Sequence, residues 1–371
     1  MAGKRRSKKK KVLFAVEILV LLVFIGGLYV YGQLNTKLDK IQQPVLDESK
    51  IKVNQEVQDS INSETSTLTG YTTYALFGID HRDKNTALGG ENSDTIIIAS
   101  VNNDTKDVKL ASVYRDTLLN MGFSDKETYS KANAAYAYGE AEQAITMLNT
   151  NLDLNISDYA TVNFNALTTI IDDLGGLDMD MSYAEIVHMN NYCVETSKVT
   201  GKKYKKIEPA VAGTYKLNGV QAVSYARIRY TAGGDYKRTE RQRLVLEKTA
   251  NKLKKQNLAT INKIIDKVMP EVSTSFSTKE ILALASGAFD FELGKTSGFP
   301  FDLETPDSVP GYSGSYVIPK GLEENVIKLH EFLFPDEDYT PTETVTNISD
   351  TLINMTNVYP STTGSGTSQY E

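Results

Sequence analysis

Three charged residues flank apolar segments in positions that suit phosphate or metal binding. Asp80 and Arg115 each follow an apolar segment directly, whereas Asp94 directly precedes one. In a hairpin, the start of one strand lies beside the end of the next, so Asp94 and Arg115 should be neighbours. Asp80 joins them if the first strand also pairs antiparallel with the second. Clustered carboxylates of this kind suit Mg²⁺, which commonly takes one or two of them plus phosphate oxygens. Simple turn capping, with ion pairs to Arg82 and Arg115, is the alternative.

A second group of charges begins at Arg227. The segment 221–230 is predicted to be a strand, which would place Arg227 and Arg229 on one face about 7 Å apart. Two like charges on one face repel each other unless an anion or an acid lies between them. The pair therefore indicates an anion site, although a solvated basic surface is an equally simple explanation.

The next arginines open a predicted helix over 239–256. Arg238 and Arg241 lie three residues apart, with Gln242 beside them, just after a pair of glycines. The dipole at a helix N-terminus disfavours cations. Arginines at this position are therefore best explained by a bound anion, which free N–H groups and guanidinium groups would hold together.

Strand and helix patterns alternate along the chain, which predicts an α/β fold with a sheet covered by helices. The chain has 371 residues, of which 40% are hydrophobic, enough for a substantial core. The predicted strands at 95–101 and 108–113 are separated by a polar turn and should form a hairpin. Besides these two and 221–230, a strand is predicted at 73–79, and helices at 132–148, 163–174, 239–256, 263–268 and 278–286.

The N-terminal region has the pattern of a membrane anchor. Residues 1–11 form a basic tail, and 12–32 are apolar and long enough as a helix to span roughly 30 Å of hydrocarbon. The basic tail should lie in the cytoplasm, which places the rest of the chain outside. Residues 33–70 are predicted to be an extracellular stalk. A cleaved signal peptide is the alternative for the apolar run.

The remaining composition limits the class of protein. The folded domain is predicted over 71–335, and the polar residues 336–371 are predicted to be disordered. A single cysteine, Cys193, excludes an internal disulfide and favours the outer surface of a Gram-positive bacterium. The net charge of −7 argues against general nucleic-acid binding.

Several short segments between about 74 and 254 form a series of motifs. They are Gly78-Ile79-Asp80, Asn92-Ser93-Asp94-Thr95, Ser112-Val113-Tyr114-Arg115-Asp116-Thr117, Lys131-Ala132-Asn133-Ala134-Ala135-Tyr136, Leu174-Gly175-Gly176-Leu177-Asp178, Leu217-Asn218-Gly219-Val220-Gln221-Ala222, Tyr225-Ala226-Arg227-Ile228-Arg229 and Gly234-Asp235-Tyr236-Lys237-Arg238-Thr239-Glu240-Arg241-Gln242. Each motif is weak alone, but their order and spacing together are specific, and they resemble those of the LytR-CpsA-Psr family of cell-wall ligases. Departures from the family pattern are Asn92, Tyr114 and Glu140, which replace a basic residue, a proline and a glycine.

The resemblance implies a fold and a reaction. The fold is an α-β-α domain with a central mixed sheet and a polyprenyl-lipid pocket between sheet and helices. The reaction transfers a glycopolymer from an undecaprenyl-pyrophosphate carrier to peptidoglycan, as a phosphodiester on the muramic acid 6-hydroxyl, and releases polyprenyl phosphate. The polymer is left open between capsule, wall teichoic acid and other rhamnose-type polymers.

The resemblance also implies roles for residues of this sequence. Asp80 and Asp94 would hold Mg²⁺, or alternatively Mn²⁺, and either carboxylate is a candidate general base beside Arg115. The residues that would bind the pyrophosphate are Arg115, Arg227, Arg229, Arg238, Arg241 and Gln242. Three other functions stay open: a lipid-pyrophosphate-binding scaffold, a transcriptional attenuator, and a lipid pyrophosphatase in which water replaces the sugar acceptor.

Overall fold

The computed structural model describes residues 41–44, 46–62, 67–79, 88–229, 231, 234–253, 255–277, 280 and 292–361. The predicted basic tail, the anchor at 12–32 and Asp80 lie outside these residues, as does the predicted helix at 278–286 apart from residue 280. In the part of the chain that is described, no helix is both long and apolar enough to cross a bilayer.

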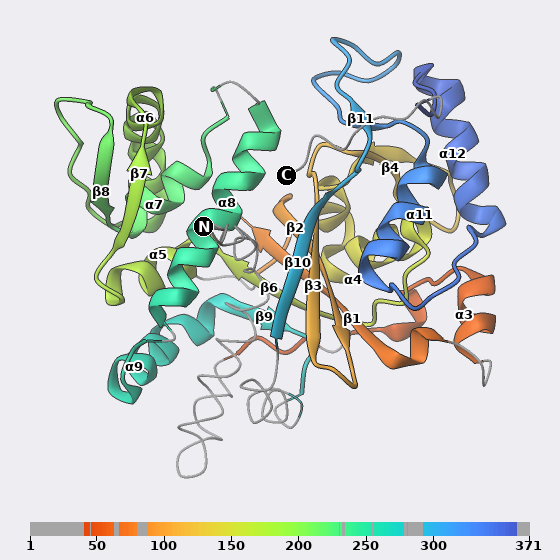
Figure 1. Cartoon of the computed structure of the whole chain (residues 1–371), viewed down its shortest axis with the longest axis horizontal. Helices are drawn as coiled ribbons and strands as arrows, with labels where there is room; N and C mark the ends of the chain where they lie inside the picture. The colour runs from red at the N-terminus through yellow and green to blue at the C-terminus, as the bar shows by residue number, and fades with distance from the viewer. Residues whose placement is uncertain are drawn as a thin grey trace, which may run out of the picture.

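A mixed sheet of six described strands forms the centre of the molecule (Figure 1). Its strands, in spatial order, are β10 (Glu292–Phe299), β3 (Asp107–Val113), β2 (Ser93–Asn102), β1 (Tyr71–Ile79), β6 (Asp158–Asn163) and β9 (Val272–Thr274). The pairs β1–β2, β2–β3 and β6–β9 are antiparallel, whereas β1–β6 and β10–β3 are parallel. The predicted hairpin of β2 and β3 is confirmed, and β1 pairs antiparallel with β2, which is the condition under which Asp80 is expected to join Asp94 and Arg115.

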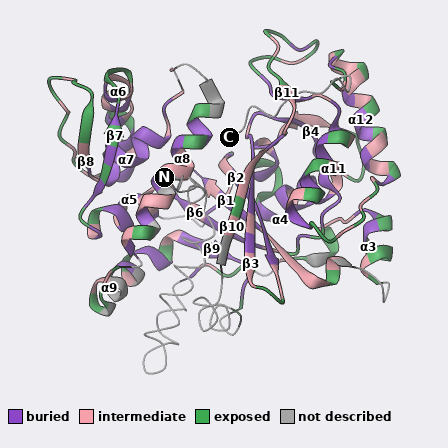
Figure 2. Cartoon of the chain, viewed as in Figure 1, coloured by how far each residue is buried: buried purple, intermediate pink, exposed green. Residues whose placement is uncertain are grey.

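One face of the sheet packs on one helix from the first half of the chain and two helices from its C-terminal part. These are α4 (Ala134–Leu152), α11 (Leu322–Leu333) and α12 (Glu343–Thr356). Because side chains alternate along a strand, Ile96 and Ile98 of β2 point into this core while Ile97 points to the other face. Buried residues run through the central strands and the inner sides of these helices (Figure 2).

Helix α12 corrects the prediction that the chain is disordered from residue 336. Val345, Ile348 and Leu352 are spaced at i, i+3 and i+7, and all three are buried in the main core. Thr342 caps the helix by accepting a hydrogen bond from the Val345 amide. The polar composition hid this amphipathic spacing, and the burial of three aliphatic side chains stabilises the segment against the domain.

The described part of the predicted stalk also packs on the domain. Residues 41–62 include η1 (Glu48–Lys50) and α3 (Gln55–Ile61), and Ile41 and Val57 are buried. The backbone N–H of Gln42 donates to the backbone carbonyl of Val272 in β9 at 3.0 Å. The folded region therefore begins well before residue 71, where the prediction placed it, and continues through η2 (Thr67–Gly70) into β1.

The opposite face of the sheet meets a second group of elements with its own core. These are α5 (Phe164–Asp173), β7 (Leu177–Met181), α6 (Tyr183–Thr200), β8 (Gly213–Leu217), α7 (Gly219–Ala226) and α8 (Gly234–Leu253). Gly219 allows α7 to approach α5 closely, because a Cβ there would lie 2.2 Å from the carbonyl oxygen of Thr168. Helices therefore lie on both sides of the sheet, as predicted (Figure 1).

Helix α7 corrects the predicted strand at 221–230. Asn218 and Gln221 form a capping box, in which each side chain bonds the other residue's backbone. Every residue of α7 is buried. A fully buried segment shows neither helical nor strand periodicity, so its pattern could not distinguish the two. The smaller remaining elements are α9 (Leu258–Val268), η3 (Met269–Glu271) and the paired strands β4 (Leu118–Asn120) with β5 (Tyr129–Lys131) and β11 (Leu303–Glu304) with β12 (Ile318–Pro319).

Candidate active site

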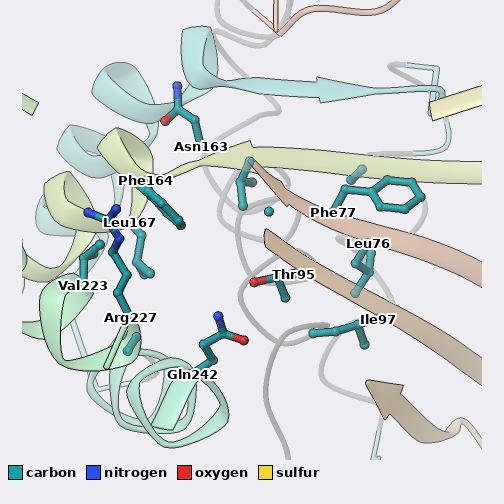
Figure 3. Close-up of a pocket in the computed structure, with 14 residues that line it drawn as sticks. Leu76, Phe77, Thr95, Ile97, Asn163, Phe164, Leu167, Val223, Arg227 and Gln242 are labelled. Atoms are coloured by element: carbon teal, nitrogen blue, oxygen red, sulfur yellow. The ribbon is translucent and has the colours of Figure 1, made fainter. Parts of the chain in front are cut away.

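A mainly apolar pocket lies between the sheet and the second group of helices. Its empty volume is about 740 Å³. Strands β1, β2 and β6 supply one wall, and α5, α7 and α8 supply the other (Figure 3). The lining residues are Leu76, Phe77, Gly78, Thr95, Ile97, Ala160, Val162, Asn163, Phe164, Leu167, Val223, Ala226, Arg227 and Gln242. A pocket with this predominantly apolar lining suits a hydrocarbon chain.

A smaller, charged pocket adjoins the apolar one. It has an empty volume of about 300 Å³ and shares Thr95, Ile97 and Gln242 with its neighbour. Its lining residues are Asp94, Thr95, Ile96, Ile97, Ser112, Val113, Arg115, Arg238, Thr239, Gln242 and Arg243. The two pockets together can accept a molecule with an apolar chain and an anionic head.

Asp94 and Arg115 form an ion pair at the wall of the charged pocket. This confirms the contact expected from the hairpin. Their side chains are 22% and 16% exposed, so bulk water screens the pair only in part. The Nε of Arg115 also lies 3.4 Å from a carboxylate oxygen of Asp116, whose other oxygen lies 3.0 Å from Lys131. Two carboxylates and two cations thus alternate beside the pocket.

Helix α8 brings Arg238 and Gln242 to the charged pocket one turn apart. Arg238 is buried, with 3% of its surface exposed, and Gln242 stands where the two pockets meet. A buried cation at the wall of a cavity is costly unless an anion or hydrogen-bonding groups compensate it. This position agrees with the predicted anion site at the start of the helix.

Arg227 reaches the site in a different way from the one predicted. It is the C-cap of α7 rather than a strand residue, and its guanidinium lines the apolar pocket. The guanidinium donates to Thr196 at 3.0 Å and to Glu195 at 2.9 Å, and it lies 5.5 Å from the ring centre of Phe164. These contacts hold the guanidinium against α5 and α6, on the helical side of the pocket.

Arg229 and Arg241 are not among the described residues that line either pocket. Since α7 ends at residue 226, Arg229 does not share a strand face with Arg227, and that prediction is wrong. Arg241 is buried and donates to Glu185 at 3.0 Å, to the carbonyl of Ile228 at 3.2 Å and to Thr231 at 2.7 Å. It ties α8 to α6 and to the segment after α7.

Comparison with known proteins identifies the family. A model of the LytR_cpsA_psr family matches residues 28–296. The chain belongs to the LytR_cpsA_psr family. This family member is 27% identical over 337 residues to the polyisoprenyl-teichoic acid–peptidoglycan teichoic acid transferase TagV of Bacillus subtilis, with 90% of this chain and 80% of TagV covered.

Solved structures share the fold of this LytR_cpsA_psr protein. Protein gbs0355 from Streptococcus agalactiae superimposes with a TM-score of 0.59 and 26% identity, covering 76% of this chain and 93% of that one. The structure of TagT with bound octaprenyl pyrophosphate lipid has a TM-score of 0.52 and 19% identity, covering 78% and 99% of the two chains. These matches confirm the mixed α/β fold with its central sheet.

The metal site predicted for this LytR_cpsA_psr protein requires carboxylates that can hold Mg²⁺. Among the described residues, no group of three or more His, Cys, Asp or Glu side chains is placed to hold a metal ion. Asp94 is described and Asp80 is not. An ionised carboxylate has about four acceptor positions, so the ion pair with Arg115 leaves room for a metal. One or two carboxylates with phosphate oxygens are an ordinary Mg²⁺ donor set, and Asp94 fits this role.

Several lining residues of the LytR_cpsA_psr site were missed by the sequence analysis. Phe164 and Leu167 of α5 and Val223 of α7 line the apolar pocket, and Arg243 lines the charged one. Apolar lining residues look like core residues in a sequence, because both are aliphatic or aromatic and partly buried. Arg243 is part of the arginine-rich run, which was the available signal for it.

Proposed function

We propose that this protein transfers an anionic or secondary cell-wall glycopolymer from an undecaprenyl-pyrophosphate carrier to peptidoglycan. The transfer forms a phosphodiester and releases polyprenyl phosphate. The observation that carries the proposal is the apolar pocket that adjoins a pocket lined by Asp94, Arg115 and Arg238. It is supported by the name of TagV, a polyisoprenyl-teichoic acid–peptidoglycan teichoic acid transferase, and by the octaprenyl pyrophosphate bound to TagT.

The two pockets fit the two parts of such a donor. The prenyl chain would lie among the apolar residues of β1, β2, α5 and α7, and the pyrophosphate would lie against the arginines. A sugar hydroxyl of the acceptor attacks the phosphorus nearer the polymer and loses its proton. The bond from that phosphorus to the bridging oxygen breaks, and polyprenyl phosphate leaves with the electron pair. Phosphoryl transfer of this kind needs reactants held in line and charge neutralised on the phosphate oxygens.

Charged side chains of the site have separate tasks in this scheme. Arg115 and Arg238 neutralise the phosphate oxygens, and Arg227 approaches from the side of α7. Asp94 lies where it can accept the proton of the attacking hydroxyl or bind Mg²⁺. Asp80 is proposed to share these tasks. Mg²⁺, or Mn²⁺ in its place, would supply further charge neutralisation when bound.

The N-terminal region completes the proposal. Residues 12–32 would anchor the protein in the membrane of a Gram-positive bacterium, with the basic tail in the cytoplasm and the folded domain outside. This topology would put the folded domain on the outer side of the membrane in which a prenyl-linked donor resides, the same side as the wall.

A product analysis tests the proposed function against its alternatives. The full chain in detergent is incubated with a prenyl-pyrophosphate-linked polymer, uncross-linked peptidoglycan and Mg²⁺, and the products are identified by mass spectrometry. The proposal predicts polymer attached to peptidoglycan through a phosphodiester, together with polyprenyl phosphate. Release of inorganic phosphate without attachment would identify a pyrophosphatase, and bound but unchanged donor would identify a scaffold.

A further inference from the structure

The end of helix α6 and the loop that follows it are strongly basic. We name residues 198–206 the basic segment, because it contains five lysines and no carboxylate. Its lysines are Lys198, Lys202, Lys203, Lys205 and Lys206. All are exposed except Lys202, which is partly buried and pairs with Asp172 at 3.2 Å. In the described part of the chain, no carboxylate lies within ion-pair distance of the other four. Their mutual repulsion favours an anionic partner.

The backbone of the basic segment is held in place by side chains of α6 and α7. Three of its carbonyl groups accept hydrogen bonds, from Ser197 at 2.5 Å, Asn218 at 2.9 Å and Gln221 at 2.8 Å. Tyr204 packs on the core of the second group of elements, and the lysines on either side of it are exposed. The lysines therefore project from a fixed backbone, so little ordering entropy is lost when an anion binds.

The basic segment lies beside the helical wall of the apolar pocket. The ammonium of Lys202 donates to the hydroxyl of Thr169 on α5 at 2.8 Å. Leu167, two residues earlier on α5, lines the pocket. On α6, the residue that accepts a hydrogen bond from Arg227 is Thr196, two residues before the segment. The segment therefore begins within about two helical turns of the pocket wall.

The order of the strands gives the apolar pocket a direction. The charged pocket lies against β3 and β2, and the apolar pocket lies against β2, β1 and β6, which are neighbours in that order. A prenyl chain whose pyrophosphate lies in the charged pocket therefore extends toward β6 and α5. That is the side on which the basic segment lies. A long prenyl chain leaves a bilayer head first, so the tail end of the pocket should face the membrane.

The start of the described chain lies on the same side of the sheet. Gln42 forms a bridge with Ser273 of β9, the edge strand beyond β6. Its side-chain amide also donates to the carbonyl of Pro270, just after α9, at 3.1 Å. The eight residues 33–40 separate this point from the predicted anchor at 12–32, and eight residues span at most roughly 30 Å. The edge of the sheet at β9 must therefore lie near the membrane if residues 12–32 cross it.

Ion pairs connect this edge of the sheet to the basic segment. Lys267 of α9 pairs with Asp173 of α5 at 2.8 Å, and the adjacent Asp172 pairs with Lys202 at 3.2 Å. Helix α9 leads directly into η3 and β9, and it lies beside α5 (Figure 1). The start of the described chain, α9, the end of α5 and the basic segment therefore belong to one side of the molecule.

We propose that the basic segment docks on the anionic phospholipid headgroups of the membrane and holds the tail end of the apolar pocket toward the bilayer. This inference rests on the proposed function for the membrane anchor and the prenyl-linked donor. Lysine suits such a partner, because its ammonium is a compact charge on a flexible stem and is attracted to an anionic lipid surface. The polymer of the donor is a poorer match, because it extends from the pyrophosphate in the charged pocket, away from the segment.

Energy transfer to the membrane surface tests this docking in the full chain. The protein carries a donor dye on Val211→Cys and is placed in nanodiscs that carry an acceptor dye on some headgroups. Val211 is 57% exposed and lies shortly after the basic segment, whereas the native Cys193 is buried. The nanodiscs contain either neutral phosphatidylcholine alone or a mixture with anionic phosphatidylglycerol.

A triple variant removes the charge of the segment, and a second triple variant is its matched control. The test variant combines Lys203→Gln, Lys205→Gln and Lys206→Gln. The control combines Lys126→Gln, Lys295→Gln and Lys328→Gln, which are exposed lysines between β4 and β5, on β10 and on α11. Each lysine near an anionic surface changes the docking equilibrium about fivefold, so the test variant should lower the ratio of docked to undocked protein about a hundredfold.

The protein with its native lysines and the control variant should both show more energy transfer in anionic than in neutral nanodiscs, and salt should reduce the difference. The test variant should show no such difference. Energy transfer that is equal in the two lipids for the protein with native lysines would overturn the inference, and this comparison needs no lysine variant. An equal loss in the test and control variants would overturn it as well.

Two further measurements distinguish the sources of a negative result. If these lysines bind a labelled polyglycerol phosphate while energy transfer ignores lipid charge, the segment binds polymer and the membrane proposal is wrong. Attachment of glycopolymer to peptidoglycan is measured in the same nanodiscs. If attachment proceeds while energy transfer ignores lipid charge, the docking is refuted and the proposed function stands.

Discussion

Replacing Arg115 with alanine tests the charged pocket most sharply. The guanidinium contacts both Asp94 and Asp116 and lines the pocket proposed to hold the pyrophosphate. Removing one preorganised donor to a developing charge costs about 2.7–4 kcal/mol, so transfer should fall about 10²–10³-fold. The change also leaves two carboxylates, 22% and 10% exposed, without this cation. Stability should therefore fall by about 1–3 kcal/mol, between the values for exposed and buried pairs.

The assay must separate these two effects. Initial rates of polymer transfer are measured at a temperature where both proteins are folded, and urea unfolding gives the stability change. Arg115→Lys should recover part of the rate, because it keeps the charge but loses the fork of donors. Lys267→Ala is the matched control, since Lys267 of α9 is a cation paired with Asp173 of α5, away from the two pockets. A rate of Arg115→Ala within threefold of wild type would refute the assigned role.

Three further variants test the fold. Leu352→Ala should lower the free energy of unfolding by about 2–4 kcal/mol in a urea titration, because α12 belongs to the main core; an unchanged midpoint would contradict this. Asn218→Ala should cost about 1 kcal/mol in the same titration through loss of the α7 capping box, and no loss would argue against the helix. Burial tends to raise the pKa of Glu185, but hydrogen bonds from Ser182 and Arg241 outweigh it and hold the pKa below the ordinary 4.5. The ionised Glu185 carboxylate therefore stabilises the fold at pH values above 4.5, and this contribution is lost as the pH falls through the lowered pKa of the folded state. Glu185→Gln should narrow the difference in unfolding free energy between neutral and acidic pH. An unchanged difference would contradict the assignment.

The sequence carried enough information for the centre of the sheet. Apolar β-branched segments separated by a polar turn predicted β2 and β3, and the pairing of hairpin ends placed Asp94 beside Arg115. Both inferences use only residues close together in the sequence, namely a strand, a turn and the next strand. The start of α8 likewise placed Arg238 and Gln242 at one site.

Features that depend on tertiary packing were harder to predict. Helix α7 is buried all round, so its residues carried no periodic signal, and the strand predicted in its place misplaced Arg229. Arg241 lies three residues after Arg238 in the same arginine-rich helix, yet its side chain contacts Glu185 and the segment after α7. Which side of a helix meets a cavity follows from how the helix docks, and short-range spacing does not specify that docking.

The binding of prenyl pyrophosphates of increasing length to the unaltered protein tests the central claim most directly. Dissociation constants are measured for a series from two to eight isoprene units with the same pyrophosphate head. Because each buried CH₂ group contributes about 0.8 kcal/mol, one buried five-carbon isoprene unit contributes up to about 4 kcal/mol. Affinity should therefore rise by up to about a thousandfold per unit and level off once the pocket is filled. An affinity independent of chain length would show that the apolar pocket does not hold the lipid, and would contradict the account.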